Sequence, residues 1–368
     1  MKNQHSELSE LGWSDWFAEK AEDQSADTIA RVIAVDRGQL LLMDQARTFR
    51  AKLSGGYQHR HRLAHESPCV GDWVCLEKPA EGGMGVVQTL LERRTSLRRK
   101  SAGNEIDHQM IAANMDYVVI IQSCHLDFDL KRLERYLVMA QEGGAEPFIL
   151  LTKTDLVEPD VLAAQMAEIR AAGIAAPVVA VSNVTRAGVD DFQRRLLAGK
   201  TYCFVGSSGV GKSTLINLLL GHELQFTMEV SETGEGRHST VRRELIRLAG
   251  GALVIDNPGM REVGVFSAEA DIGHSYPDIE ALSAGCRFSD CSHTGEPGCA
   301  VREAAQSGEI SQAHFENYLK LKEESAFNQL SYVEKRRKDR SFGKYIKSAK
   351  NDLKQDTRVS GGSQQQHV

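Results

Sequence analysis

The segment Gly206-Ser-Ser-Gly-Val-Gly-Lys-Ser213 most constrains what this chain can fold into. It matches the pattern G-x-x-x-x-G-K-[ST], and it lies between an apolar run at residues 201–205 and a helix-forming run at residues 212–220. A strand, a glycine-rich loop and a helix in this order direct backbone N–H groups and a helix N-terminus at bound phosphate groups. The sequence therefore predicts a phosphate-binding loop in an α/β sheet.

The residue types in this loop predict separate roles. The Lys212 ammonium reaches the β and γ oxygens of a nucleotide, and the Ser213 hydroxyl binds Mg²⁺. Thr214 follows on the α-phosphate side, and the glycines let the backbone wrap the phosphates. The candidate phosphate-binding residues are Gly206, Ser207, Ser208, Gly209, Val210, Gly211, Lys212, Ser213 and Thr214.

The chain around the loop alternates between apolar strands and helical segments. Apolar runs at residues 117–123, 148–152, 177–181 and 201–205 lack polar alternation, and each precedes a helical pattern that ends near a glycine. Two further strands are expected near residues 244–250 and 252–256. This order predicts a doubly wound, mainly parallel sheet that is covered on both faces.

Five regions are expected along the 368 residues. Short strand patterns separated by Gly-rich turns predict a small β-barrel before the sheet, and periodicity alone does not distinguish an oligonucleotide-binding barrel from an SH3-like one. The expected regions are an acidic N-terminal tail at 1–27, the barrel with a basic linker at 28–100, the α/β domain at 101–265, a cysteine-rich segment with a basic helical extension at 266–354, and a disordered tail at 355–368.

Charge and composition narrow the class of protein. Hydrophobic residues make up 41% of the chain and no apolar run approaches the roughly 20 residues of a membrane span, so we expect a cytoplasmic protein that does not cross a membrane. The net charge is −6, yet basic residues gather at 92–100 and at 331–354. Two basic patches on an acidic protein predict directed contact with a polyanion.

Two segments after the phosphate loop carry candidate nucleotide-sensing residues. Asp256 ends an apolar strand in Asp256-Asn-Pro-Gly259, where an Asp reaches Mg²⁺ and the Gly259 N–H senses the γ-phosphate. The glycine-rich loop at 234–240 lies between the two motifs, as a switch loop would, and its Thr240, or else Ser239, is a candidate Mg²⁺ ligand. The sequence thus predicts a nucleoside triphosphatase with a switch loop.

Base selectivity is predicted from Thr152-Lys153-Thr154-Asp155, which is similar to the guanine-recognition element N-K-x-D. The Asp155 carboxylate accepts from the two donors of a guanine edge, which adenine lacks, and this disfavours an ATP-dependent kinase or transport ATPase. Ser182-Asn183 lies where a backbone N–H meets guanine O6. Because these elements precede the phosphate loop, we expect a circularly permuted chain.

The cysteine-rich segment predicts a structural metal site. Cys286, Cys291, His293 and Cys299 form a potential Cys₃His ligand set in a stretch with little apolar content. The chain holds seven cysteines, an odd number, which argues against a disulfide scaffold. A full tetrahedral set leaves no open position for chemistry, so we expect one structural Zn²⁺ per chain.

The permuted motif order, GRHST at 236–240, the Asp256-Asn-Pro-Gly259 turn and the cysteine spacing together resemble the ribosome small-subunit-dependent GTPase A family, over roughly residues 28–350. The resemblance implies an oligonucleotide-binding (OB-fold) barrel, a circularly permuted P-loop GTPase domain and a zinc-binding helical domain. It also implies hydrolysis of GTP to GDP as a checkpoint in late maturation of the 30S subunit, with 16S rRNA as partner. We expect a monomer.

The chain departs from the common pattern at three positions. Thr152 replaces the Asn whose amide ties the base-binding loops together, and Asn183 replaces an Ala, so we expect weaker guanine binding. Met260 stands where other GTPases have a water-orienting Gln, which predicts slow intrinsic hydrolysis. The resemblance implies His238 as the residue that orients water, with Arg261 or a ribosomal group as other candidates. The alternative function is a nucleotide-gated rRNA-binding adaptor with negligible hydrolysis.

Overall fold

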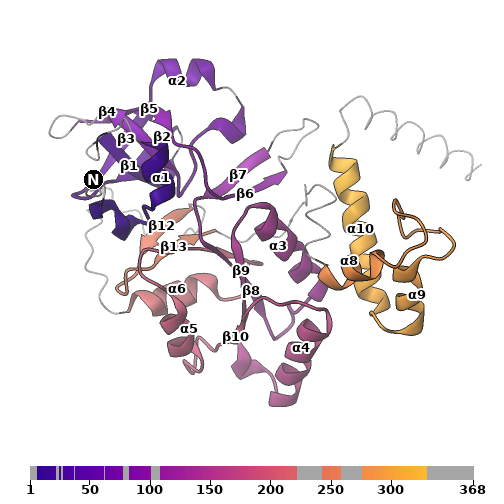
Figure 1. The fold of residues 1–368 in the computed structure, drawn as a ribbon. Helices are drawn as coiled ribbons and strands as arrows, with labels where there is room; N and C mark the ends of the chain where they lie inside the picture. Colours follow the sequence, from indigo (N-terminus) through magenta and orange to yellow (C-terminus); the bar gives the residue numbers. More distant parts are fainter. Residues whose placement is uncertain are drawn as a thin grey trace, which may run out of the picture.

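The computed structural model describes residues 6–21, 25, 28–36, 38–61, 63–77, 83–100, 108–221, 243–257 and 276–329 (Figure 1). Its centre is a parallel sheet with β8 next to the phosphate-loop strand β11, and an antiparallel strand, β12, extends it. The strands are β8 (Tyr117–Ser123), β9 (Glu146–Thr152), β10 (Val178–Ala180), β11 (Thr201–Val205), β12 (Glu244–Arg247) and β13 (Leu253–Asp256), in the order β10-β9-β8-β11-β13-β12. The predicted doubly wound sheet is confirmed.

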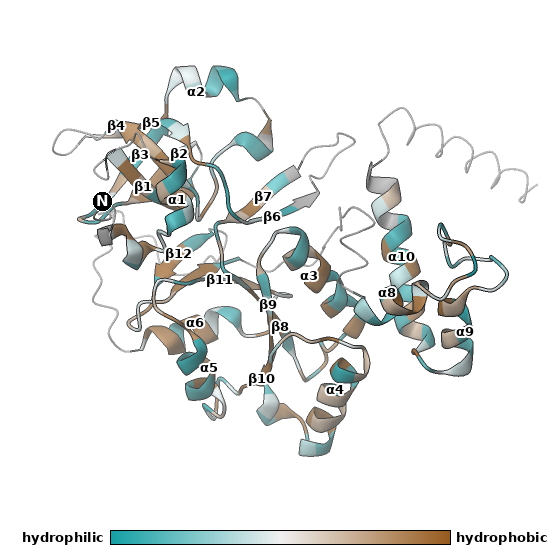
Figure 2. Ribbon diagram, viewed as in Figure 1, coloured by the Kyte–Doolittle hydropathy of each residue, from teal (hydrophilic) through white to brown (hydrophobic). Residues whose placement is uncertain are grey.

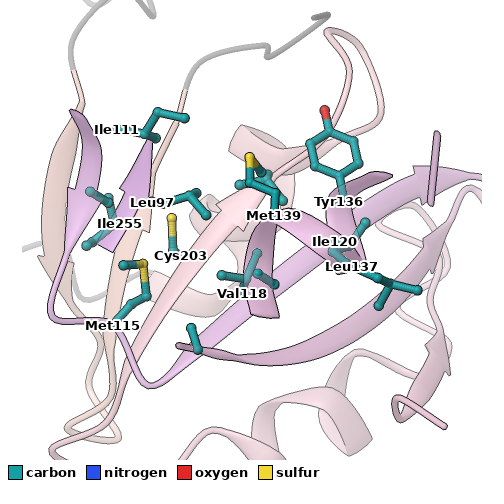
Figure 3. Close-up of a cluster of buried hydrophobic side chains, with 14 of the residues drawn as sticks. Leu97, Ile111, Met115, Val118, Ile120, Tyr136, Leu137, Met139, Cys203 and Ile255 are labelled. Carbon is teal, nitrogen blue, oxygen red and sulfur yellow. The ribbon is translucent and has the colours of Figure 1, made fainter. Parts of the chain in front are cut away.

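Helices cover both faces of this sheet: α3 (Leu130–Glu142) and α4 (Pro159–Ala171) on one, α5 (Val189–Arg195) and α6 (Lys212–Leu220) on the other. Val118 and Ile120 of β8 pack in the core with Tyr136 of α3, as Figure 3 shows, whereas their neighbours Val119 and Ile121 pack in the other core. Alternate side chains of one buried strand therefore serve two cores, which is why the strand is apolar throughout.

A small barrel precedes the sheet. It consists of β1 (Ile29–Asp36), β2 (Gln39–Met43), β3 (Thr48–Leu53), β4 (Trp73–Glu77) and β5 (Gly85–Leu90), and the pairing of β1 with β4 closes it. The short helix α2 (Gly55–Arg60) joins β3 to the rest of the barrel and is mainly hydrophilic, whereas the strands are mainly hydrophobic (Figure 2). Strand β3 alternates exposed Thr48, Arg50 and Lys52 with buried or half-buried residues, so one of its faces is turned to solvent.

Residues 6–21 lie within the predicted acidic N-terminal tail. They form the 3₁₀ helix η1 (Ser6–Leu11) and the helix α1 (Asp15–Lys20), which pack on the barrel. The Trp13 ring meets Trp73 of β4 edge to face, with ring centroids 4.8 Å apart. Glu10, Asp15 and Glu19 are exposed while Leu8, Trp13 and Phe17 are buried, so an amphipathic pattern is hidden within an acidic composition.

The barrel and the sheet are continuous. Ala34 of β1 pairs with Glu244 of β12, so that a single eleven-stranded sheet runs through the described residues. The fully buried Arg31 guanidinium donates to the carbonyls of Leu11, Gly71 and Asn114, and thereby ties the N-terminal segment, the barrel and the α/β domain together. A hairpin of β6 (Ser96–Lys100) and β7 (His108–Ala113) lies between the two domains.

A C-terminal helical module packs beside α3, on a different side of the α/β domain from the barrel (Figure 1). Its helices are α8 (Pro277–Ser283), α9 (Ala300–Ser307) and α10 (Gln312–Gln329), which share a core with Val138 of α3. The predicted basic extension beyond residue 329 lies outside the described residues. Among the helices that the structure describes, none is long and apolar enough to cross a membrane.

Candidate nucleotide site and metal cluster

The predicted nucleotide-binding elements follow neighbouring parallel strands. The phosphate loop follows β11, the Thr152–Asp155 segment follows β9, Ser182-Asn183 follows β10, and Asp256 ends β13. The carboxyl ends of parallel strands meet at one edge of a sheet, and a crevice forms there where successive strands are added on opposite sides. All the described candidate nucleotide-binding elements therefore lie at one edge of the sheet.

Glycine is required at two positions of the phosphate loop. Gly206 has φ +148°, and a Cβ there would lie 2.2 Å from the Ile121 carbonyl oxygen. Gly211 has φ +98° and is the N-cap of α6, and a Cβ there would lie 2.7 Å from Asn183 Nδ2. The positive φ at both positions disfavours any residue with a Cβ, and at Gly206 a Cβ would also clash with the Ile121 backbone. The loop is thus as tightly specified as its motif predicts.

The Lys212 side chain lies against the backbone of the phosphate loop. Its Nζ donates to the carbonyls of Gly206 and Ser207 at 2.8 and 2.7 Å. Burial lowers the pKa of Lys212, and the nearby Asp256 carboxylate opposes that shift. Ser213 and Thr214, next in the helix, are exposed. A cation held at the loop, beside exposed hydroxyls at a helix N-terminus, is an arrangement that binds anions.

Asp256 is the acidic partner in this region. Burial raises the pKa of its carboxyl group, and Lys212 lowers it in turn. Its Oδ1 atom is buried and has no hydrogen-bond partner among the described residues. A buried acceptor without a donor is costly, and a hydrated Mg²⁺ is a group that would satisfy it. Asp256 and the Ser213 hydroxyl together fit the oxygen ligands that Mg²⁺ prefers.

A neighbouring loop fixes the position of the Asp155 carboxylate. The buried Ser182 hydroxyl donates to Asp155 Oδ1 at 2.6 Å and accepts from the N–H groups of Val184 and Thr185. Asp155 itself is exposed, so its carboxylate is accessible to a ligand. Lys153 has a left-handed backbone, φ +57°, and Thr154 follows it in the short helix η4 (Thr154–Leu156). An ordered carboxylate next to open solvent can read a pair of N–H donors.

Two of the three departures from the common pattern, Thr152 and Asn183, contact the phosphate loop. Thr152 Oγ1 donates to the Val210 carbonyl at 2.6 Å, and Asn183 Nδ2 donates to the Gly211 carbonyl at 2.9 Å. The expected weakening of guanine binding stays a prediction. The Thr152 hydroxyl, in place of an Asn amide, does reach the backbone of the phosphate loop.

Several predicted residues lie outside the described residues. They are the candidate water-orienting residues His238 and Arg261, the switch residue Thr240, Gly259 and Met260. Their roles stay predictions from sequence.

The predicted metal ligands do converge. The ligand atoms of Cys286, Cys291, His293 and Cys299 all lie within 4.8 Å of one another. Cys286 Sγ and Cys299 Sγ lie 3.7 and 3.4 Å from His293 Nδ1, and 4.0 Å from each other. A tetrahedral ion with bonds of about 2.3 Å to sulfur and about 2.0 Å to nitrogen separates its ligand atoms by roughly 3.5 to 3.8 Å. The donor set and its spacing fit Zn²⁺.

Local backbone structure directs the ligands inward. His293 adopts a left-handed conformation, φ +66°, which is unusual outside glycine, and its ring is buried. Cys299 is the N-cap of α9, and its Sγ accepts from the Arg302 N–H at 3.4 Å. A helix N-terminus favours a negatively charged thiolate, the form that binds metal.

A second polar cluster joins the module to α3, and sequence reasoning missed it. His314 of α10 lies 2.5 Å from Glu134 of α3 and 3.1 Å from Asp278 of α8. Asn317 Nδ2 donates to Glu134 and to the Tyr276 hydroxyl. One signal was available, because Glu134 interrupts the apolar stripe of Leu133, Tyr136 and Leu137 on the buried face of a helix.

Part of the basic segment at 92–100 is used inside the protein. Arg93 forms a bidentate pair with the fully buried Asp72 and donates to two barrel carbonyls. Arg94 pairs with Asp116 at 2.7 Å. Arg98 is exposed on β6. A charge count from sequence therefore overstates how much of this segment is free for a polyanion.

Comparisons with known proteins agree with this architecture. The model of the RsgA GTPase family matches residues 90–266. The chain is 38% identical over 356 residues to a protein named small ribosomal subunit biogenesis GTPase RsgA 2 from Vibrio parahaemolyticus, and the match covers 94% of this chain and 93% of that protein.

Two solved structures share the fold. YjeQ from Thermotoga maritima matches with a TM-score of 0.61 at 26% identity, covering 81% of this chain and 98% of that one. YloQ, described as a circularly permuted GTPase, matches with a TM-score of 0.59 at 25% identity, covering 83% and 96%. The predicted permuted fold is confirmed, and the chain belongs to the RsgA GTPase family.

Proposed function

We propose that this chain hydrolyses GTP to GDP and phosphate in the biogenesis of the small ribosomal subunit. The observation that carries the proposal is the convergence of three loops at one sheet edge: a glycine-rich loop that presents Lys212, a loop that holds Asp155, and a loop whose Ser182 orients that carboxylate. A phosphate site and a guanine-reading carboxylate in one crevice are what GTP requires.

The phosphate loop binds the triphosphate. When GTP enters, Lys212 leaves the carbonyls of Gly206 and Ser207 and pairs with phosphate oxygens, which relieves part of the cost of its burial. Ser213 and Thr240 would hold Mg²⁺, with Asp256 contacting it through water, and the ion would supply charge stabilisation at the phosphates. Gly259 senses the γ-phosphate, and His238 orients the attacking water.

The base is read by Asp155, with Lys153 along its face and the Asn183 backbone N–H at O6. Asp155 accepts two hydrogen bonds from guanine, and an adenine in the same place would leave a carboxylate without donors. Thr152 and Thr154 belong to the same base-reading segment, Thr152–Asp155.

The partner is the small ribosomal subunit, in keeping with the names of the relatives. We propose 16S rRNA as the contacted polyanion, through Arg98 and the basic segment at 331–354. The Cys₃His cluster holds one structural Zn²⁺. The protein acts as a monomer in the cytoplasm.

Turnover measurements test the proposal. GTP hydrolysis is measured with purified small subunits, with large subunits and without ribosomes, and only small subunits should accelerate it. Lys212→Ala should abolish the stimulated rate, because it removes a cation from the transition state. Wild-type turnover by Lys212→Ala would overturn the site assignment.

A second assay checks the base. Asp155→Asn should shift preference from GTP to xanthosine triphosphate, whose 2-oxo group accepts where guanine donates. GTP binding with negligible hydrolysis under every condition would instead favour a nucleotide-gated adaptor.

A further inference from the structure

Two successive carbonyls of the phosphate loop accept hydrogen bonds from the two base-reading loops. Thr152, which precedes Lys153 and Asp155, donates to the Val210 carbonyl at 2.6 Å. Asn183, which follows Ser182, donates to the Gly211 carbonyl at 2.9 Å. Thr152 is fully buried and Asn183 is half-buried. Each loop that reads the base therefore holds one peptide group of the loop that binds phosphate.

These two peptide groups carry the Gly211 and Lys212 N–H groups of the phosphate loop. The Val210 carbonyl shares a peptide with the Gly211 N–H, and the Gly211 carbonyl shares one with the Lys212 N–H. No described peptide bond is cis, and in a planar trans peptide the carbonyl and the N–H point in opposite directions. Fixing a carbonyl toward the base-reading loops turns its N–H away from them, toward the phosphate site.

The direction of both bonds is unambiguous. A carbonyl oxygen only accepts, so the atom of the Asn183 amide that faces Gly211 is its nitrogen. The Gly211 carbonyl also accepts from the Leu215 N–H at 2.9 Å within α6, and its two lone pairs accommodate both donors. Thr152 Oγ1 lies closer to the Val210 carbonyl than to that of Gln122, which is 3.2 Å away.

We propose that Thr152 and Asn183 are positioning residues of the phosphate site. Their side chains fix the Gly211 and Lys212 N–H groups, and Asn183 supplies from the second loop the amide donor that an N-K-x-D element carries in the first. The inference rests on the proposed function and deepens it, because it assigns to these side chains a role at the phosphates instead of at the base.

The variants for a test remove one donor each. Thr152→Val keeps the shape and deletes the hydroxyl, whereas Thr152→Ser keeps the hydroxyl. Asn183→Ala deletes the amide, and Asn183→Asp replaces it with a group that cannot donate and repels the carbonyl. Val184→Ala is the matched control, since Val184 is the next residue and its side chain is 80% exposed.

The decisive readout compares GDP with inosine diphosphate, which lacks the 2-amino group but carries the same phosphates. Thr152→Val and Asn183→Ala should weaken both ligands by roughly tenfold each and leave the ratio of the two dissociation constants unchanged. Thr152→Ser should bind as the wild type does, as should Val184→Ala. The stimulated kcat should also fall in Asn183→Ala, while the unfolding temperature stays near that of the control.

Two results would overturn the inference. Unchanged affinity for both diphosphates in Thr152→Val and Asn183→Ala would show that the ties do not position the loop. A changed ratio, with GDP weakened and inosine diphosphate unaffected, would place the role at the base. Failure of the proposed function is distinct, because in that case the wild type itself would not prefer GDP over ADP.

Discussion

The Cys₃His cluster, which could hold a metal ion, and the buried cluster around Glu134 both lie in the C-terminal module, but they are built in different ways. The metal ligands Cys286, Cys291, His293 and Cys299 come from one short loop. The buried cluster joins Glu134 to His314, which lies 180 residues later, and to Tyr276 and Asn317, and His314 in turn contacts Asp278. With a metal bound, the first cluster would fold the loop that contains it, whereas the second joins the module to α3 of the α/β domain.

The difference separates two sources of stability. A metal site closes a loop that has almost no core, so its binding free energy is folding free energy for that loop. A buried ion pair is a balance between desolvation and attraction, and it is weak evidence for stability as long as both partners are present. The two clusters should therefore respond very differently to deletion, and four experiments, ordered by expected effect, test this comparison.

Metal removal should have the largest effect. Structural Zn²⁺ contributes about 10–16 kcal/mol of apparent binding free energy in small zinc domains. Chelation, or Cys291→Ser, should unfold the loop from residue 286 to residue 299 and expose α9, while β8 and β11 stay protected from amide hydrogen exchange. Ser289→Ala in the same loop, at an exposed position, is the control. Freshly purified protein without about one zinc per chain would contradict the zinc assignment.

Removal of the Glu134 carboxylate should come next. Glu134→Ala leaves the buried His314 and Asn317 with one partner fewer, and breaking a buried pair costs about 3–5 kcal/mol. Urea unfolding should show this loss of free energy, and hydrogen exchange should show it first in α10. The control is Lys131→Ala, at an exposed position of the same helix, which should change little. An equal effect of both variants would show that the cluster does not attach the module.

A hydrophobic replacement sharpens the comparison. Well-packed apolar residues often substitute for a buried ion pair at no cost, whereas no apolar set replaces a metal ligand set. The triple variant Glu134→Leu, His314→Leu and Asn317→Leu should recover part of the stability that Glu134→Ala loses. Urea unfolding of the two variants side by side measures the recovery, and a triple variant less stable than Glu134→Ala would mean that the cluster holds the module by specific polar contacts.

The sequence predicted what depends on local spacing. The phosphate loop, the parallel strands with their helices and the four metal ligands each occupy one short segment, so residue type and order determine them. His314 could not be assigned from sequence, since its partner Glu134 is brought to it only by the packing of α10 on α3. The Thr152 tie was likewise hidden, because a substitution at one loop is compensated by backbone that the fold places beside it.

Composition alone also gave a wrong picture of which charged residues lie on the surface, because that depends on burial. The acids of residues 6–21 conceal an apolar face, and Arg93 is counted as basic surface although it neutralises Asp72. In both segments the number of charged residues does not show which side chains face water.

The smallest effect concerns pH, and here the two clusters should have opposite signs. Burial alone would lower the pKa of His314, but its hydrogen bonds with Asp278 and Glu134 raise it to about 9 from an ordinary 6.5. A group with a raised pKa in the folded state contributes stability that is complete below pH 6.5 and is lost as the pH rises through about 9. The contribution is about 3 kcal/mol at most.

Metal binding instead strengthens as thiols ionise. Between pH 6 and pH 9.5, the wild type should therefore lose stability relative to His314→Gln, with zinc retained throughout. A constant difference in unfolding free energy between the two proteins across this range would show that His314 is not charged in the folded state.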